Sequence, residues 1–134
     1  MKKIAALFFV VISLLVTSCQ EGKESVVGST SDTYIPNLIF AVDTTYLDSP
    51  NSSLVAKGTV INGGNSKVTS PWYVECQFYT NSSKNAKLGG NYTKIGVPLA
   101  ENESTFWTIT FSSSNVNVNS YPNFAVGNLR GIYK

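Results

Sequence analysis

Hydrophobic and polar positions divide the chain into three parts. An apolar run over residues 4–16, interrupted only by Ser13, comes first. A polar stretch rich in Gly, Ser, Thr and charge follows over residues 20–33. From Tyr34 onward, apolar and polar residues alternate in short runs between turn-forming clusters, which is typical of β-strands. The pattern predicts an apolar leader, a flexible tether and one β-domain.

No helical period continues beyond the leader, and Asn62-Gly63 and Gly89-Gly90 indicate turns. Short strands separated by regularly spaced turn-forming clusters are typical of an immunoglobulin-like sandwich. We therefore expect an all-β fold, with a single immunoglobulin-like antiparallel β-sandwich of about seven strands over residues 34–134. The stretch 112–120 is either a polar strand or a loop. The expected strands are 37–43, 53–62, 72–80, 92–98, 105–112, 115–119 and 123–133.

The run 72–79 alternates strictly, so its two sets of positions should face opposite sides of a sheet. Aromatic rings beside polar groups on an exposed sheet can bind sugars or protein partners, so the outward set is a candidate binding face. Alternatively, these side chains only cover the sheet and contact neighbouring strands. The core-facing set is Trp72, Val74, Cys76 and Phe78. The outward set is Tyr73, Glu75, Gln77 and Tyr79.

Phe106 completes the candidate binding residues. Trp107, Ile109 and Phe111 share one parity that is expected to face the core. Phe106 therefore points the opposite way, where it either joins the tyrosines of the binding face or covers an edge.

The apolar leader is organised like a secretory signal. Lys2 and Lys3 precede the apolar run, and the small residues Thr17 and Ser18 follow it. A helix over residues 4–16 would rise about 20 Å, less than the roughly 30 Å of a bilayer core. We therefore expect translocation rather than a permanent membrane span.

Val16-Thr17-Ser18-Cys19 resembles the bacterial lipobox, in which the cysteine is lipidated and the signal is cut just before it. The resemblance implies a cleaved signal peptide (residues 1–18), a lipidated Cys19 that begins a flexible tether (19–33), and a membrane anchor of acyl chains such as palmitate. It also implies a cell-envelope location. Gln20 resembles the sorting pattern for the outer membrane, on its periplasmic face or at the cell surface. Ordinary secretion is the alternative.

Cleavage would also change the charge of the chain. The formal net charge of +2 includes Lys2 and Lys3; without them, eight basic and eight acidic residues remain, and the basic ones are scattered. We expect no nucleic-acid partner, because phosphate binding needs a concentrated basic patch. With Cys19 lipidated, Cys76 has no disulfide partner, and we expect a small buried thiol rather than a reactive one.

Part of the domain resembles the FxLYD-type domain of bacterial lipoproteins and other envelope proteins. Glu101 and Asn102 stand where that family has Pro and Gly, and Asn tolerates the left-handed conformation. The resemblance implies a small immunoglobulin-like sandwich without catalytic machinery and without a common ligand. The similar stretches are Gly58-Thr59-Val60-Ile61-Asn62, Trp72-Tyr73-Val74-Glu75-Cys76-Gln77-Phe78-Tyr79, Leu88-Gly89 and Leu99-Ala100-Glu101-Asn102-Glu103-Ser104-Thr105-Phe106.

The chain offers few groups for catalysis. It contains no histidine, which removes the usual general base and the commonest metal ligand, and one available cysteine cannot form a thiolate cage. Asp43 and Glu75 could form a glycosidase-like pair, but their positions favour solvated surface. Asp43, Asp48 and Asn51 could line a calcium loop, although their spacing fits no known cage. We expect no enzymatic activity, no cofactor and no metal.

Together these features predict a bacterial envelope lipoprotein whose sandwich is a non-catalytic binding or interaction module for an unknown envelope protein. The first alternative is a carbohydrate-binding accessory lipoprotein, whose exposed aromatics would bind a glycan. The second is a small hydrolase that uses carboxylates alone.

Overall fold

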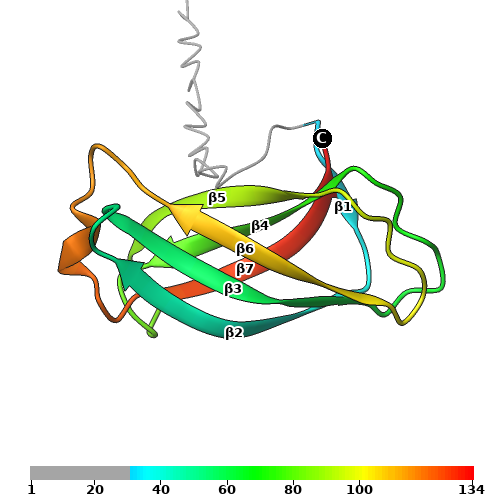
Figure 1. Cartoon of the computed structure of the whole chain (residues 1–134), viewed down its shortest axis with the longest axis horizontal. Coiled ribbons are helices and arrows are strands. Elements are labelled where there is room, and N and C mark those ends of the chain that lie inside the picture. Colours follow the sequence, from blue (N-terminus) through cyan, green and yellow to red (C-terminus); the bar gives the residue numbers. More distant parts are fainter. Residues whose placement is uncertain (1–30) are drawn as a thin grey trace, which may run out of the picture.

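The computed structural model describes residues 31–134; the leader, Cys19 and most of the expected tether lie outside the described residues. Strands dominate this part, and loops join them at the two ends of an elongated molecule (Figure 1). The elements are β1 (Thr33–Ile35), β2 (Leu38–Asp48), β3 (Ser53–Asn62), β4 (Trp72–Tyr79), β5 (Lys87–Ile95), β6 (Ser104–Phe111), the 3-10 helix η1 (Val118–Ser120) and β7 (Ala125–Tyr133).

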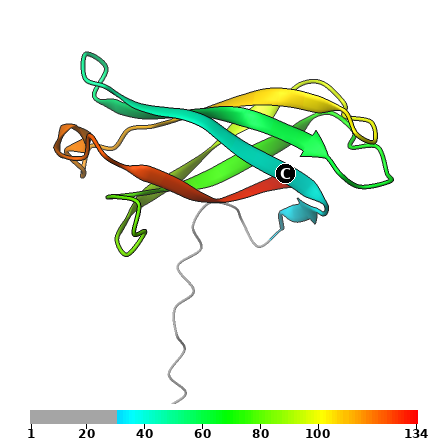
Figure 2. The same cartoon turned by 90° about the horizontal axis from the view of Figure 1, so that it is seen from below.

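Two antiparallel sheets form the sandwich. The four-stranded sheet has the order β1-β7-β4-β5, and the three-stranded sheet has the order β2-β3-β6. Figure 2 shows the two layers from below, with the chain turning back at both ends. The prediction of an all-β antiparallel sandwich is confirmed.

The core lies between the two sheets and follows the alternation in the sequence. Trp72, Val74, Cys76 and Phe78 are all buried, as are the core-facing residues of β6. The Phe78 ring stacks on Phe111 at 5.3 Å and on Phe124 at 5.8 Å between ring centroids. The apolar cluster has members on β3, β4, β5, β6 and β7, so residues 31–134 form a core between the two sheets.

Several strand boundaries differ from those expected. β1 was not expected, and β2 continues through a β-bulge between Val42 and Thr44 as far as Asp48. The stretch 115–119 is not a strand: part of it belongs to η1, and the buried Val118 fixes this segment to the core. Val116 and Val118 alternate with asparagines as in a strand, but two apolar residues in a run of Asn and Ser suit a loop equally well, and here both pack on the core from a loop.

The start of β5 shows why a glycine pair can mislead. Gly89-Gly90 was expected to form a turn, yet both residues lie inside β5, paired with Phe78 and Gln77. A Cβ atom on Gly89 would lie 2.5 Å from the Phe111 ring, and its φ of 153° is one that other residues rarely adopt. Gly89 therefore makes room for a core ring rather than for a turn.

Asn62 fixes the loop that follows β3. Its side-chain amide donates to the carbonyl oxygens of Ser66 at 2.8 Å and Leu99 at 3.0 Å, and its oxygen accepts from the Gly64 amide. Asn102 adopts a positive φ of 62°, as its tolerance of the left-handed conformation predicted. Among residues 31–134, no helix is long and apolar enough to cross a membrane.

Candidate functional site

The outward set on β4 was expected to be solvent-exposed, and for three of its four members this was wrong. Glu75 is 2% exposed, Gln77 is 1% exposed and Tyr79 is buried, while Tyr73 is half-buried. The physical reason is the position of β4 between β7 and β5. Arg130 and Asn128 on β7 reach Glu75 and Tyr79, whereas alternation alone reports only which side of the sheet a residue faces.

An ion pair covers Glu75. Arg130 lies opposite Glu75 in the β4–β7 register, and its Nε donates a hydrogen bond to Glu75 Oε1. The guanidinium also lies over the Tyr34 ring, 4.6 Å from its centroid, and donates to the Tyr34 hydroxyl. Because Asp43 lies on the other sheet, Glu75 has no carboxylate pair with it. Glu75 therefore belongs to a structural ion pair through Oε1, while its Oε2 is buried without a hydrogen-bond partner among the described residues.

The tyrosines of the expected binding face have partners within the chain. The Tyr73 and Tyr92 rings meet edge to face at 5.7 Å, and the Lys134 ammonium lies 4.0 Å from the Tyr92 centroid. The Tyr79 hydroxyl accepts a hydrogen bond from the Asn128 side chain at 2.9 Å. These contacts match the cross-strand alternative that the alternation left open.

Gln77 has an unusual environment on the same face. It lies opposite Gly90 on β5 and Gly127 on β7, so neither neighbour places a side chain beside it. Both polar atoms of its amide are buried without a hydrogen-bond partner in the described part of the chain, a costly arrangement.

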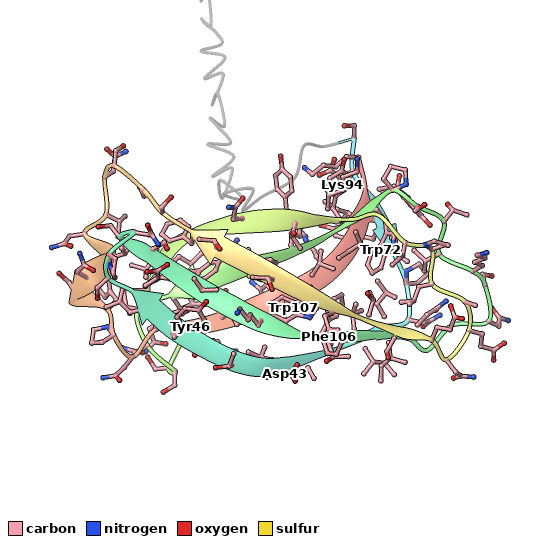
Figure 3. The ribbon with its side chains drawn as sticks, viewed as in Figure 1. Asp43, Tyr46, Trp72, Lys94, Phe106 and Trp107 are labelled. Atoms are coloured by element: carbon pink, nitrogen blue, oxygen red, sulfur yellow. The ribbon has the colours of Figure 1, made fainter. Side chains whose placement is uncertain are left out.

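Phe106 lies on the other sheet and so does not join the tyrosines. It is 79% exposed on β6, and Ile39 on β2 is 59% exposed. The register places Ala41, Thr59 and Phe106 in one row across the three strands, with Ile39 and Ile61 in the next row. We call this surface the Phe106 face: the outer side of β2-β3-β6, formed by Ile39, Ala41, Thr59, Ile61 and Phe106. Figure 3 shows Phe106 with Asp43 and Tyr46 along these strands.

Two charged side chains border the Phe106 face, and both have partners on the same sheet. Asp43, at the β2 bulge, accepts a hydrogen bond from the Thr59 hydroxyl at 3.0 Å. The Lys57 ammonium lies 5.3 Å from the Tyr46 ring centroid. The face therefore exposes apolar surface and one threonine, and charges of both signs border it.

A small cavity lies at one end of the sandwich, between the β1–β2 turn and the β3–β4 loop. Its volume is about 230 Å³, and its lining includes Tyr34, Asn37, Asn62, Lys67 and Tyr133. The buried Asn62 amide already donates to Ser66 in the loop after β3 and to Leu99 in the loop after β5, and the Tyr133 hydroxyl accepts from the Thr69 amide. The cavity thus has fewer free polar groups than its lining suggests. Sequence reasoning missed it, because the strand β1 that forms one wall was not expected.

The groups that most often carry chemistry are not assembled within residues 31–134. This part of the chain holds no group of three or more His, Cys, Asp or Glu side chains placed to bind a metal ion. Burial raises the pKa of the Cys76 thiol to about 12, so it stays protonated and unreactive near neutral pH. The expected buried thiol is confirmed.

No family model, no curated protein and no solved structure matches the chain. The lipobox and FxLYD-type resemblances therefore stay predictions.

Proposed function

We propose that this protein is a lipid-anchored lipoprotein of the bacterial cell envelope, and that its sandwich is a non-catalytic binding module acting through the Phe106 face. The observation that carries the proposal is the exposure of Phe106, with 79% of its surface open to solvent beside other apolar residues of the sheet. On the tyrosine side of the molecule, by contrast, the exposed rings of Tyr34 and Tyr92 already contact Arg130 and Lys134.

An exposed phenylalanine on a rigid strand is well suited to binding. Contiguous apolar surface rimmed by polar residues marks interaction sites on soluble domains, and large aromatic anchors provide much of the binding energy at such sites. Phe106 and Thr59 are directly opposite in the β3–β6 register, so the backbone beneath the ring is fixed before a partner arrives. A preformed surface loses little conformational entropy on binding.

The anchor follows from the leader and from the two cysteines. An apolar run that ends in Val16-Thr17-Ser18-Cys19 supports lipidation of Cys19, and two or more acyl chains hold a protein stably on a membrane. Cys76 is buried in the core and does not compete for modification. An outer-membrane location, on the periplasmic face or at the cell surface, suits a module that meets envelope partners.

Two readouts in the same cells test the proposal. A photo-reactive phenylalanine analogue at position 106 should crosslink to a protein, whereas the analogue at Val97, which is 51% exposed in the β5–β6 loop, should not. Cells supplied with a labelled fatty acid should label the wild-type chain and Cys76→Ala, but not Cys19→Ala. Equal crosslinking at 106 and 97 contradicts the binding face, and label on Cys19→Ala contradicts the anchor.

A further inference from the structure

We propose that the Phe106 face pairs with the same face of a second copy of this chain, forming a two-fold dimer. This inference rests on the proposed function, since it names the partner of that surface. The relevant row runs from Ala41 on β2 through Thr59 on β3 to Phe106 on β6. The row therefore has the small Ala41 side chain on the edge strand β2 and the large, exposed Phe106 side chain on the edge strand β6, with β3 between them.

This arrangement is self-complementary. When two such sheets face each other about a two-fold axis along β3, β6 of each copy lies over β2 of the other. Phe106 of one copy then covers Ala41 of the other, where the short side chain leaves room, and the reciprocal contact forms at the same time. The two Ile61 side chains lie next to the axis. Face-to-face packing of β-sheets at about 10 Å is the ordinary geometry of a sandwich core.

The charges on the face do not oppose this pairing. Asp43 accepts the hydrogen bond from Thr59, and the Lys57 side chain extends over Tyr46 on β2, away from the central strand. Because one acidic and one basic group border the row, two identical faces meet without a single-sign field. A strongly acidic or basic partner would find no matching charge here.

The size of the face predicts a weak dimer rather than a permanent one. The three strands have 11, 10 and 8 residues and lie about 4.8 Å apart, so the outer side of their sheet has a flat footprint of about 460 Å². Specific interfaces at the low end use roughly 600 Å² of accessible surface on each partner. The expected dimer is therefore concentration-dependent, and confinement on a membrane would favour it.

Sedimentation equilibrium of residues 31–134 tests the dimer. The weight-average mass of the wild type should rise from monomer toward dimer as concentration approaches about 1 mM, the weak end of specific association. Phe106→Asp should raise the dissociation constant about 30-fold or more, as loss of a central anchor does. Ala41→Arg should act in the same way from the opposite edge strand, while Val97→Asp, outside the face, should match the wild type. Circular dichroism checks that each variant is folded.

A wild type that stays monomeric over this range overturns the dimer, as does association that Phe106→Asp and Ala41→Arg leave unchanged. In the crosslinking experiment, an adduct at position 106 of twice the chain's mass supports the dimer. An adduct with a different protein overturns it and leaves the binding module intact. No adduct at all overturns both.

Discussion

Charged and aromatic side chains on the outer side of the four-stranded sheet are bound to one another residue by residue. The Arg130 side chain, for example, forms an ion pair with Glu75 and contacts both the ring and the hydroxyl of Tyr34. A buried carboxylate is expensive without a partner, so Glu75 depends on Arg130 in a way that an exposed acidic residue would not. The alternation predicted the side of the sheet on which Glu75 lies. The alternation could not predict that Arg130 is the partner of Glu75, because Arg130 lies on a strand distant in sequence.

Arg130→Ala should lower the free energy of unfolding by about 2 kcal/mol, because it leaves the Glu75 carboxylate buried and unpaired. The loss should be smaller than for a fully buried pair, since the Arg130 side chain is 34% exposed. Chemical denaturation of residues 31–134 measures it. Lys57→Ala removes an exposed cation from the Tyr46 ring and should cost about 0.5–1 kcal/mol. Equal effects of the two substitutions would contradict a structural role for the Glu75 pair.

The Cys76 thiol should make stability depend on alkaline pH. Burial raises its pKa to about 12 from an ordinary value of 9.0, so the folded chain holds the proton more tightly than the unfolded chain. This contribution is complete below pH 9 and is lost as the pH rises from 9 toward 12. The stability of the wild type should therefore fall relative to Cys76→Ala across that window, as measured by denaturation at several pH values. A constant difference between the two would exclude the effect.

Among the elements, β5 shows most clearly how tertiary contacts override a local signal. Gly89-Gly90 is a turn signal by composition, yet the pair lies within the strand because the Phe111 ring occupies the place of a side chain on Gly89. That contact joins β5 to a residue of the opposite sheet and leaves no trace in the local pattern. β3, β4, β6 and β7 were predicted to within two residues at either end, because each is a short apolar-rich run bounded by turn-forming residues.

Gly89→Ala should destabilise the sandwich by about 2–4 kcal/mol, since the new methyl group would meet the Phe111 ring and the backbone would be strained. The matched control is Gly96→Ala, where no atom lies within 4 Å of the added Cβ and the φ is ordinary. That substitution should be neutral or slightly stabilising, because it restricts the unfolded chain. Thermal unfolding of both variants decides the point. Similar melting temperatures would show that Gly89 is not needed for core packing.

The two sides of the described part of the molecule differ. On the four-stranded sheet the exposed rings of Tyr34 and Tyr92 contact Arg130 and Lys134, whereas on the three-stranded sheet Phe106 is 79% exposed and Ile39 is 59% exposed. The sequence predicted the fold class and the core, both of which follow from local alternation. The division between the two faces depends on which strands lie inside a sheet, and no local pattern contains that information. Phe106 was therefore grouped with tyrosines that lie on the opposite side of the sandwich.

The crosslinking yield at position 106 in intact cells, relative to the yield at position 97, tests the central claim most directly. Both wild-type side chains are exposed and apolar, so the two positions differ chiefly in whether they lie on the Phe106 face. The account predicts a discrete adduct at position 106, with the mass of two chains, and no comparable adduct at position 97. Equal yields at the two positions, or no adduct at either, would contradict it.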